Sequence, residues 1–296
     1  MSGMSGMSGV FDLRVRVWDE NRRMWPEDAR PPSTKHRASG RALERLPEGV
    51  PAVSVVHEDT LDAALRLLGS GASARPLVLN MADDVRPGGC VAAGGGMQEE
   101  SLFRRTDLHA HLLPRLRPVE RPDGVLPALY PIARDEAVYS PDVVVCRRGE
   151  AEGYRLLAAG EMPRIGVVSC PGVAMPALSQ DARAFAHEAD REALRAKVRV
   201  IFEIAELHGH DALVLGALGC GAFGCPPHDV ARVFGEELER GTLPPSVTQV
   251  VFAVLGAANH AAFRERLAGA FTRDVGIIAP PGSCSAARAC GTRLPG

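Results

Sequence analysis

Hydrophobic positions recur along the middle of the chain with two different spacings. Short runs of apolar and β-branched residues predict strands, first at Ala52–Val56 and then at Leu77–Leu79. Between them, Asp59 can cap a helix. The apolar residues of that helix are three and four positions apart, at Leu61, Ala64, Leu65 and Leu68. Predicted strands and predicted helices therefore alternate along the chain from about residue 50 onward.

The same alternation continues toward the C-terminus. Further strands are predicted at Asp142–Cys146, Arg164–Ser169, Ala212–Leu215 and Val247–Val254. Further helices are predicted at Gln98–His111, at Asp181–Leu207 with Gly209 following as a left-handed end residue, after Pro226-Pro227, and at Asn259–Leu267. Strands that alternate with helices predict an α/β fold with a mixed, mainly parallel sheet and helices on both faces. Ligands of such folds bind at the carboxyl ends of the strands.

The two ends of the chain lack this regularity. Residues 1–9 are a Met-Ser-Gly repeat, and residues 10–50 show poor periodicity, with one helix expected near Gly40–Leu46. The segment 272–296 is rich in Gly, Pro, Ala and Ser. We therefore expect a partly disordered N-terminal extension over 1–50, one domain over 51–271, and a disordered tail over 272–296.

Composition and charge narrow the class of protein. Hydrophobic residues make up 46% and charged residues 24% of the 296 residues, which is typical of a globular protein. The net charge of −2 gives no support for sequence-specific binding of nucleic acid or for binding to a membrane. The N-terminus has no secretory signal, so an intracellular, by default cytoplasmic, location is expected, and we expect a monomer. The seven cysteines form no CxxC pair and are expected to be reduced.

A glycine-rich loop follows the second predicted strand. It contains five glycines, at positions 88, 89, 94, 95 and 96, and leads into the helix that begins at Gln98. Such a backbone can adopt positive φ and direct its N–H groups at a phosphate or a ribose. A flexible surface loop is the alternative interpretation.

The helix after this loop begins with two adjacent carboxylates. Neighbouring helical residues point about 100° apart, so Glu99 and Glu100 cannot perform the same task. One can hold a ligand hydroxyl while the other faces the bond that breaks. Acidic residues in a first turn also simply favour helix formation, but that does not account for their delivery by a glycine loop from a strand end.

A second glycine loop follows the predicted strand Ala212–Leu215. Gly219, Gly221 and Gly224 match G-x-G-x-x-G between a strand and a helix. A dinucleotide-binding dehydrogenase would also need an acidic residue at the end of the next strand, where Gly256-Ala257-Ala258 stands instead. We keep the phosphate-binding part of this interpretation and reject the nicotinamide part. Phe223 in the loop either packs internally or forms a wall against a sugar or base.

Other chemistries have weaker support. Cys220, Cys225 and His228 are close in sequence but lack a fourth ligand at the usual spacing, so no metal site is expected. A thiol nucleophile at Cys90 or Cys170 would need a base that the sequence does not identify. The chain has no P-loop and no nucleophile elbow.

The two loops, in this order, resemble the catalytic domain of microbial-type poly(ADP-ribose) glycohydrolases (PARGs), a branch of the macrodomain fold. The family carries a GGG loop followed by QEE, and here Gly88-Gly89-Cys90 is followed after seven residues by Gln98-Glu99-Glu100. The resemblance covers about residues 50–270. Supporting matches are HEDTLDAA (57–64), LVLNMA (77–82), VYSPDVVVCR (138–147), VVSCPG (167–172), LGALGCGAFGCPP (215–227) and VVFAVL (250–255).

The resemblance implies an enzyme that hydrolyses the O-glycosidic ribose–ribose bond of poly(ADP-ribose) without a cofactor or metal. Glu100 would act as general acid and base, and Glu99 would bind ribose hydroxyls. Asn80 would contact the distal ribose, and the second loop would wrap the diphosphate. The residues implied to bind ADP-ribose are Asn80, Gly88, Gly89, Cys90, Gln98, Gly219, Cys220, Gly221, Ala222, Phe223 and Gly224.

Two positions depart from the family pattern. Cys90 replaces the third glycine of GGG, which adds bulk near the expected ligand path, and Cys225 stands where a polar residue is common.

Two alternative functions stay open: a macrodomain that binds ADP-ribose without cleaving it, and a hydrolase that removes mono-ADP-ribose from protein or nucleic acid. The intact QEE favours an enzyme.

Overall fold

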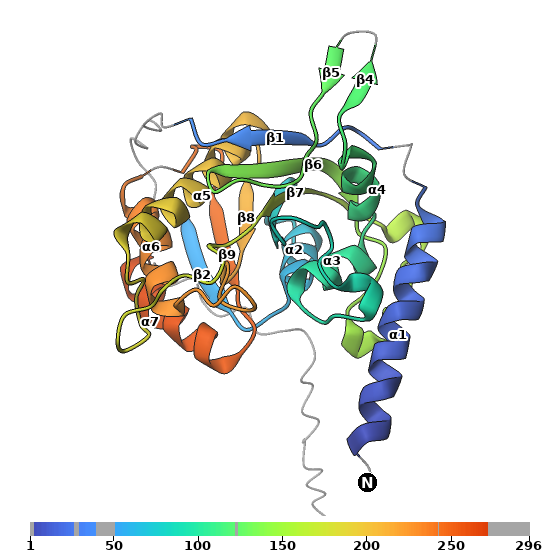
Figure 1. Ribbon diagram of the computed structural model, residues 1–296, viewed down its shortest axis with the longest axis horizontal. Coiled ribbons are helices and arrows are strands. Elements are labelled where there is room, and N and C mark those ends of the chain that lie inside the picture. The colour runs from blue at the N-terminus through green and yellow to red at the C-terminus, as the bar shows by residue number, and fades with distance from the viewer. Residues whose placement is uncertain (1–2, 27–29, 40–50, 122–123, 242, 272–296) are drawn as a thin grey trace, which may run out of the picture.

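Seven strands form the central sheet of the protein, in the order β1-β6-β7-β3-β8-β9-β2 (Figure 1). The computed structural model describes residues 3–26, 30–39, 51–121, 124–241 and 243–271. Strands β2, β9, β8, β3 and β7 run parallel. At one edge, β6 pairs antiparallel with β7, and β1 pairs antiparallel with β6. The strands are β1 (Thr34–Arg37), β2 (Ala52–Val56), β3 (Pro76–Met81), β6 (Glu136–Val144), β7 (Arg164–Cys170), β8 (Ala212–Leu215) and β9 (Gln249–Ala253). The predicted mixed, mainly parallel α/β fold is confirmed.

A separate hairpin, β4 (Val119–Arg121) and β5 (Gly124–Leu126), projects from the sheet edge (Figure 1). The helices are α1 (Gly3–Met24), α2 (Thr60–Gly69), α3 (Gln98–Arg105), α4 (Leu108–Leu112), α5 (Glu188–Leu207), α6 (Pro227–Glu239) and α7 (Ala257–Phe271). Short 3₁₀ turns are η1 (Val91–Ala93), η2 (Leu113–Arg115), η3 (Glu150–Glu152) and η4 (Ala159–Glu161).

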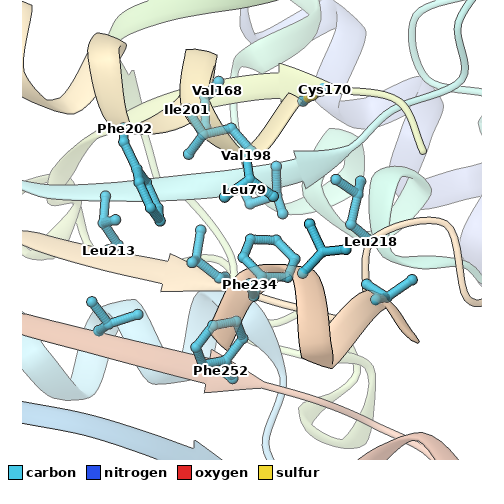
Figure 2. Close-up of a cluster of buried hydrophobic side chains, with 14 of the residues drawn as sticks. Leu79, Val168, Cys170, Val198, Ile201, Phe202, Leu213, Leu218, Phe234 and Phe252 are labelled. Carbon is cyan, nitrogen blue, oxygen red and sulfur yellow. The ribbon is translucent and has the colours of Figure 1, made fainter. Parts of the chain in front are cut away.

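Side chains of the central strands alternate between two apolar layers, as the pleat requires. On β3, Leu79 belongs to one layer and Val78 to the other. Figure 2 shows the first layer, where Leu213 and Phe252 of the sheet meet Phe202 and Phe234 of the helices α5 and α6. The second layer packs under α2, α3 and α4. Helices therefore cover both faces of the sheet, as predicted.

Several predicted elements match the structure closely. Strands β2 and β8 have the predicted bounds, and α6 begins at Pro227. The side chain of Asp59 caps α2 by accepting from the N–H groups of Leu61 and Asp62. Gly209 has φ of 63° just after α5, which is the left-handed end that the sequence indicated.

Other predicted bounds were wrong, for identifiable reasons. The helix predicted over 98–111 is divided into α3 and α4, because Thr106 is extended and pairs with Val145. The long helix predicted from Asp181 begins only at Glu188, since the preceding segment holds Phe185 in an isolated pairing with Leu178. The strand predicted at 142–146 is β6, which starts earlier and ends at Val144.

The N-terminal stretch contributes two elements that the sequence did not predict. Helix α1 lies along the flank of the domain beside α3 (Figure 1), and its Trp18 is buried in the second apolar layer. Strand β1 pairs with β6. The helix predicted near 40–46 and the tail at 272–296 lie outside the described residues, and the domain boundary at residues 50 and 51 stays a prediction. No helix in the described part of the chain is long and apolar enough to cross a membrane.

Candidate active site

A cavity of about 710 Å³ opens at the carboxyl ends of the parallel strands. That volume lies in the range of small-molecule sites, and the position is the one that open α/β sheets favour. Both glycine loops contribute to its lining. Ala253–Leu255 at the end of β9 and Gly172 just after β7 complete that wall. The loop positions predicted from the sequence therefore meet at one site.

Helix α3 is fixed to the central sheet by its first residue. The side-chain oxygen of Gln98 accepts from the N–H of Met81 at 2.9 Å, and its nitrogen donates to the carbonyl of Leu79 at 2.7 Å. This side chain therefore joins the start of α3 to the backbone at the C-terminal end of β3. Gln98 lines the cavity, but its amide group is already engaged by the backbone.

Glu99 is held firmly by groups of the protein. One carboxylate oxygen accepts from Asn80 Nδ2 at 3.2 Å, and the other accepts from the N–H of Asp83 at 2.8 Å. Burial, opposed in part by these hydrogen bonds, raises the pKa of Glu99 to about 7. The backbone N–H of Gly88 is a third donor to this carboxylate. A carboxylate offers about four acceptor sites, so Glu99 can still accept from a ligand hydroxyl in the cavity.

Glu100 is held on one side only. Its Oε1 accepts from the backbone N–H of Cys90 at 3.0 Å, while its buried Oε2 has no partner among the described residues. The side chain lines the cavity and is 6% exposed. A carboxyl group that lines a cavity, with one oxygen held by the backbone and the other without a partner, is arranged to transfer a proton. The adjacent glutamates thus have different environments.

The first loop is shaped around Glu100. Gly89 has φ of 50°, and a Cβ there would lie 2.8 Å from Glu100 Oε1. A Cβ at Gly95 would lie 3.0 Å from the same oxygen. Gly88 has φ of 86° and is packed against the Phe103 ring, where a Cβ would lie at 2.7 Å. The glycines are therefore needed to admit the carboxylate and the aromatic ring, in addition to any contact with a ligand.

The second loop is folded tightly against the segment after β7. Gly219 has φ of 74°, and a Cβ there would lie 3.1 Å from the Cα of Gly172, just after β7, and 2.6 Å from Cys225 Sγ in its own loop. The carbonyl of Phe223 accepts from the N–H of Met175 at 2.9 Å. A Cβ at Gly221 would lie 2.8 Å from the end of Met97, so the two glycine loops approach each other over the cavity.

The structure brings most of the sequence-predicted residues to the cavity. The lining includes Gly89, Cys90, Gln98, Glu99, Glu100, Gly219, Gly221, Ala222 and Phe223. Asn80, Gly88, Cys220 and Gly224 do not line it. Asn80 is fully buried behind Glu99, where its Nδ2 also donates to Ser169 Oγ on the neighbouring strand at 3.0 Å. Its contact with a ribose stays a prediction.

Sequence reasoning missed one wall of the cavity. Arg14, Arg104, Glu150 and Tyr154 line it, and none of them belongs to a glycine loop. Asp59 and Asp62 also line it and pair with Arg105 at 2.6 and 2.5 Å. Arg104 and Arg105 follow QEE closely in the sequence. Their contacts with Tyr154 and Asp59 could not be predicted, because these partners are distant along the chain.

The thiols differ in their surroundings. Cys146 and Cys225 are buried, and burial raises the pKa of each to about 11. Burial also raises the pKa of Cys170 and of Cys220. Cys90 is exposed. Within the described ranges, His, Cys, Asp and Glu side chains form no group of three or more that could hold a metal ion.

Comparison with known proteins gives a consistent result. A family model described as microbial-type PARG, catalytic domain, matches residues 11–148. A poly(ADP-ribose) glycohydrolase from Thermomonospora curvata is 27% identical, with a TM-score of 0.68 over 86% of this chain and 98% of that one. The same protein bound to the inhibitor ADP-HPD is 28% identical, with a TM-score of 0.63 and the same two coverages.

A second relative comes from another bacterium. A poly(ADP-ribose) glycohydrolase from Deinococcus radiodurans in complex with ADP-ribose is 25% identical, with a TM-score of 0.58 over 91% of this chain and 98% of that one. Comparison with curated protein sequences gives no match.

The fold and the site define a macrodomain-like α/β protein with a paired-carboxylate cavity at its strand ends. Within that class, residues 11–148 match the microbial-type PARG catalytic domain, and the chain is similar in structure to bacterial PARGs.

Proposed function

We propose that this protein is a glycosidase that hydrolyses the ribose–ribose O-glycosidic bond of poly(ADP-ribose) and releases ADP-ribose. The match to the PARG catalytic domain over residues 11–148 supports this activity, as does the similarity to the poly(ADP-ribose) glycohydrolases of T. curvata and D. radiodurans. The observation that carries the assignment of roles is the one-sided hold on Glu100. Its side chain lines the cavity and its Oε1 accepts from the backbone, while its buried Oε2 has no partner among the described residues.

In this mechanism, protonated Glu100 donates its proton to the leaving ribose oxygen as the glycosidic bond breaks. The distal sugar passes through an oxocarbenium-like state, which the negative diphosphate helps to stabilise. The Glu100 carboxylate then accepts a proton from the attacking water, whose oxygen bonds to the anomeric carbon. The proton count balances, because the acid is restored at the end of the cycle. No metal ion or cofactor takes part in the steps as written.

Glu99 is the competing candidate for the acid, because its pKa is raised to about 7. Geometry supports Glu100 instead. Both Glu99 oxygens already accept hydrogen bonds from the protein, whereas Glu100 keeps one oxygen for the substrate. We assign Glu99 to holding ribose hydroxyls. Glycine-loop N–H groups at Gly219–Phe223 would hold the diphosphate, with Phe223 against a ribose.

Incubation with poly(ADP-ribose) tests the activity through the release of free ADP-ribose. A parallel incubation with mono-ADP-ribosylated protein tests the alternative substrate, and a chelator should leave the rate unchanged. Binding of ADP-ribose without release from either substrate would make the protein a reader. The monomeric state, the cytoplasmic location and the absence of sequence-specific nucleic-acid binding stay predictions.

A further inference from the structure

Helix α3, which carries both glutamates, is only eight residues long. Helices this short are marginal by themselves, so their orientation depends on contacts with the rest of the protein. The N-terminal helix α1 supplies such contacts at the C-terminal end of α3. Asn21 Nδ2 donates to the carbonyls of Phe103 at 2.8 Å and Thr106 at 2.6 Å, which have no partner within the helix.

Helix α1 also contacts the glycine loop that precedes α3. Arg14 Nη1 donates to the carbonyl of Gly94 at 3.3 Å. The guanidinium lies directly over Gly96, where a Cβ would be 2.5 Å from Nη1. One helix of the N-terminal stretch therefore holds the catalytic segment both before and after α3, as its position beside α3 in Figure 1 allows.

A chain of polar contacts returns from Arg14 to α3. Arg14 donates through Nε and Nη2 to the two carboxylate oxygens of Glu150, at 2.6 and 3.0 Å. Tyr154 donates its hydroxyl proton to Glu150 Oε2 at 2.8 Å and accepts from Arg104 Nε at 3.1 Å. Arg104 lies one turn after Glu100 on α3. We name Arg14, Glu150, Tyr154 and Arg104 the α1 clamp.

All four clamp residues line the cavity. Arg104 is fully buried, and its two terminal amino groups have no hydrogen-bond partner among the described residues. The protein holds this guanidinium through Tyr154, by the Nε hydrogen bond to its hydroxyl and by a cation–π contact with its ring at 5.5 Å. The hydrogen bond from the Cys90 N–H to Glu100 joins the first glycine loop to α3. The clamp contacts both partners of this bond, because Arg14 contacts the loop and Arg104 lies on α3.

We propose that the α1 clamp positions Glu100 for proton transfer, and that Arg14 is its positioning residue. This inference rests on the proposed function. Ion pairs that reach solvent contribute little to the free energy of unfolding, and the Arg14 and Glu150 side chains are 18% and 40% exposed. Small displacements of a catalytic group, in contrast, reduce turnover strongly. Breaking the pair should therefore affect the rate far more than the fold.

The test uses the full chain with Arg14→Gln, Glu150→Gln and the double variant. In each we would measure kcat on poly(ADP-ribose), Kd for ADP-ribose by calorimetry, and the thermal midpoint. Each single variant should lose about tenfold or more in kcat, by analogy with misplaced catalytic groups, with Kd within about threefold. The double variant should be no slower than the slower single variant, because residues in one network are not additive.

Arg16→Gln is the matched control, since Arg16 is an exposed arginine of the same helix. It should leave kcat, Kd and the thermal midpoint unchanged. An unchanged kcat in Arg14→Gln, multiplying losses in the double variant, or a thermal midpoint that falls in step with kcat would overturn the inference. If the wild type releases no ADP-ribose, the proposed function itself fails, which is a distinct outcome.

Discussion

The backbone N–H of Cys90 donates to one carboxylate oxygen of Glu100 at 3.0 Å, and the other oxygen is buried without a partner among the described residues. The hydrogen bond comes from the backbone, so the residue type at position 90 matters less than the loop that presents it. Cys90 has φ of −99°, a conformation open to ordinary L-residues. The family's third glycine is therefore replaced here without strain.

Cys90→Gly should keep kcat within about threefold of the wild type or raise it, because the N–H donor remains and only an exposed side chain is lost. Steady-state release of ADP-ribose measures this. A large loss of turnover would show that the thiol has its own role and would reopen the nucleophile hypothesis.

Gly89→Ala should reduce kcat by about tenfold or more, since its Cβ would lie 2.8 Å from Glu100 Oε1 and displace the acid. Gly71→Ala is the matched control. Gly71 also has a left-handed φ, of 70°, but no atom lies within 4 Å of its Cβ position. Both variants bear a similar backbone cost of about 1–2 kcal/mol. Equal losses of activity in the two would mean that backbone strain, and not contact with Glu100, is the cause.

Gly221→Val should weaken ADP-ribose binding without unfolding the domain. A β-branched side chain restricts the backbone that must meet the diphosphate, and its Cβ would press on Met97. Gly160→Val, at a glycine with open space around its Cβ position, should bind normally. Calorimetry would also show whether ADP-ribose binds more tightly than AMP, as contacts at both glycine loops require. Normal binding by Gly221→Val would make the second loop structural.

The sequence predicted the central part of the fold because each of those elements carries its own signal. Val53 and Val55 lie in a β-branched run, and Asp59 stands directly before an apolar helical face. The helix end at Arg105 had no such signal, since it depends on Asn21, more than eighty positions earlier in the chain. The same is true of Arg14, whose importance arises only from its distant partners Gly94 and Glu150.

The glycine loops were predictable as a site, but the individual roles within them were not. Asn80 and Gly88 were expected at the ligand, and the structure places them behind Glu99 and against Phe103. A sequence shows that glycine is present at a position. It does not show whether a ligand or the protein's own side chain occupies the space that a Cβ would fill.

The free energy of unfolding should depend on pH because burial raises the pKa of Glu99. Its pKa is about 7 in the folded protein and 4.5 as an ordinary value, so the folded state holds the proton more tightly. This stabilisation is complete below about pH 4.5 and is lost as the pH rises through 7. The free energy of unfolding of the wild type, relative to Glu99→Gln, should fall by on the order of 3 kcal/mol between those limits. Denaturant unfolding at pH 4.5 and 8 measures it, and a constant difference would refute the raised pKa.

The contrast between Glu100→Gln and Glu99→Gln tests the central claim most directly. Glu100→Gln keeps size and accepts from the Cys90 N–H, but it cannot donate the proton. General acid–base catalysis contributes about 10²–10⁴-fold, so kcat should fall by at least about 10²-fold while Kd for ADP-ribose stays within a few-fold. Glu99→Gln sets an amide N–H₂ against one of the donors Asn80 and Asp83, so it should weaken binding as well as rate. A dead Glu99→Gln beside an active Glu100→Gln would reverse the assignment, and equal, mild effects from both would contradict it.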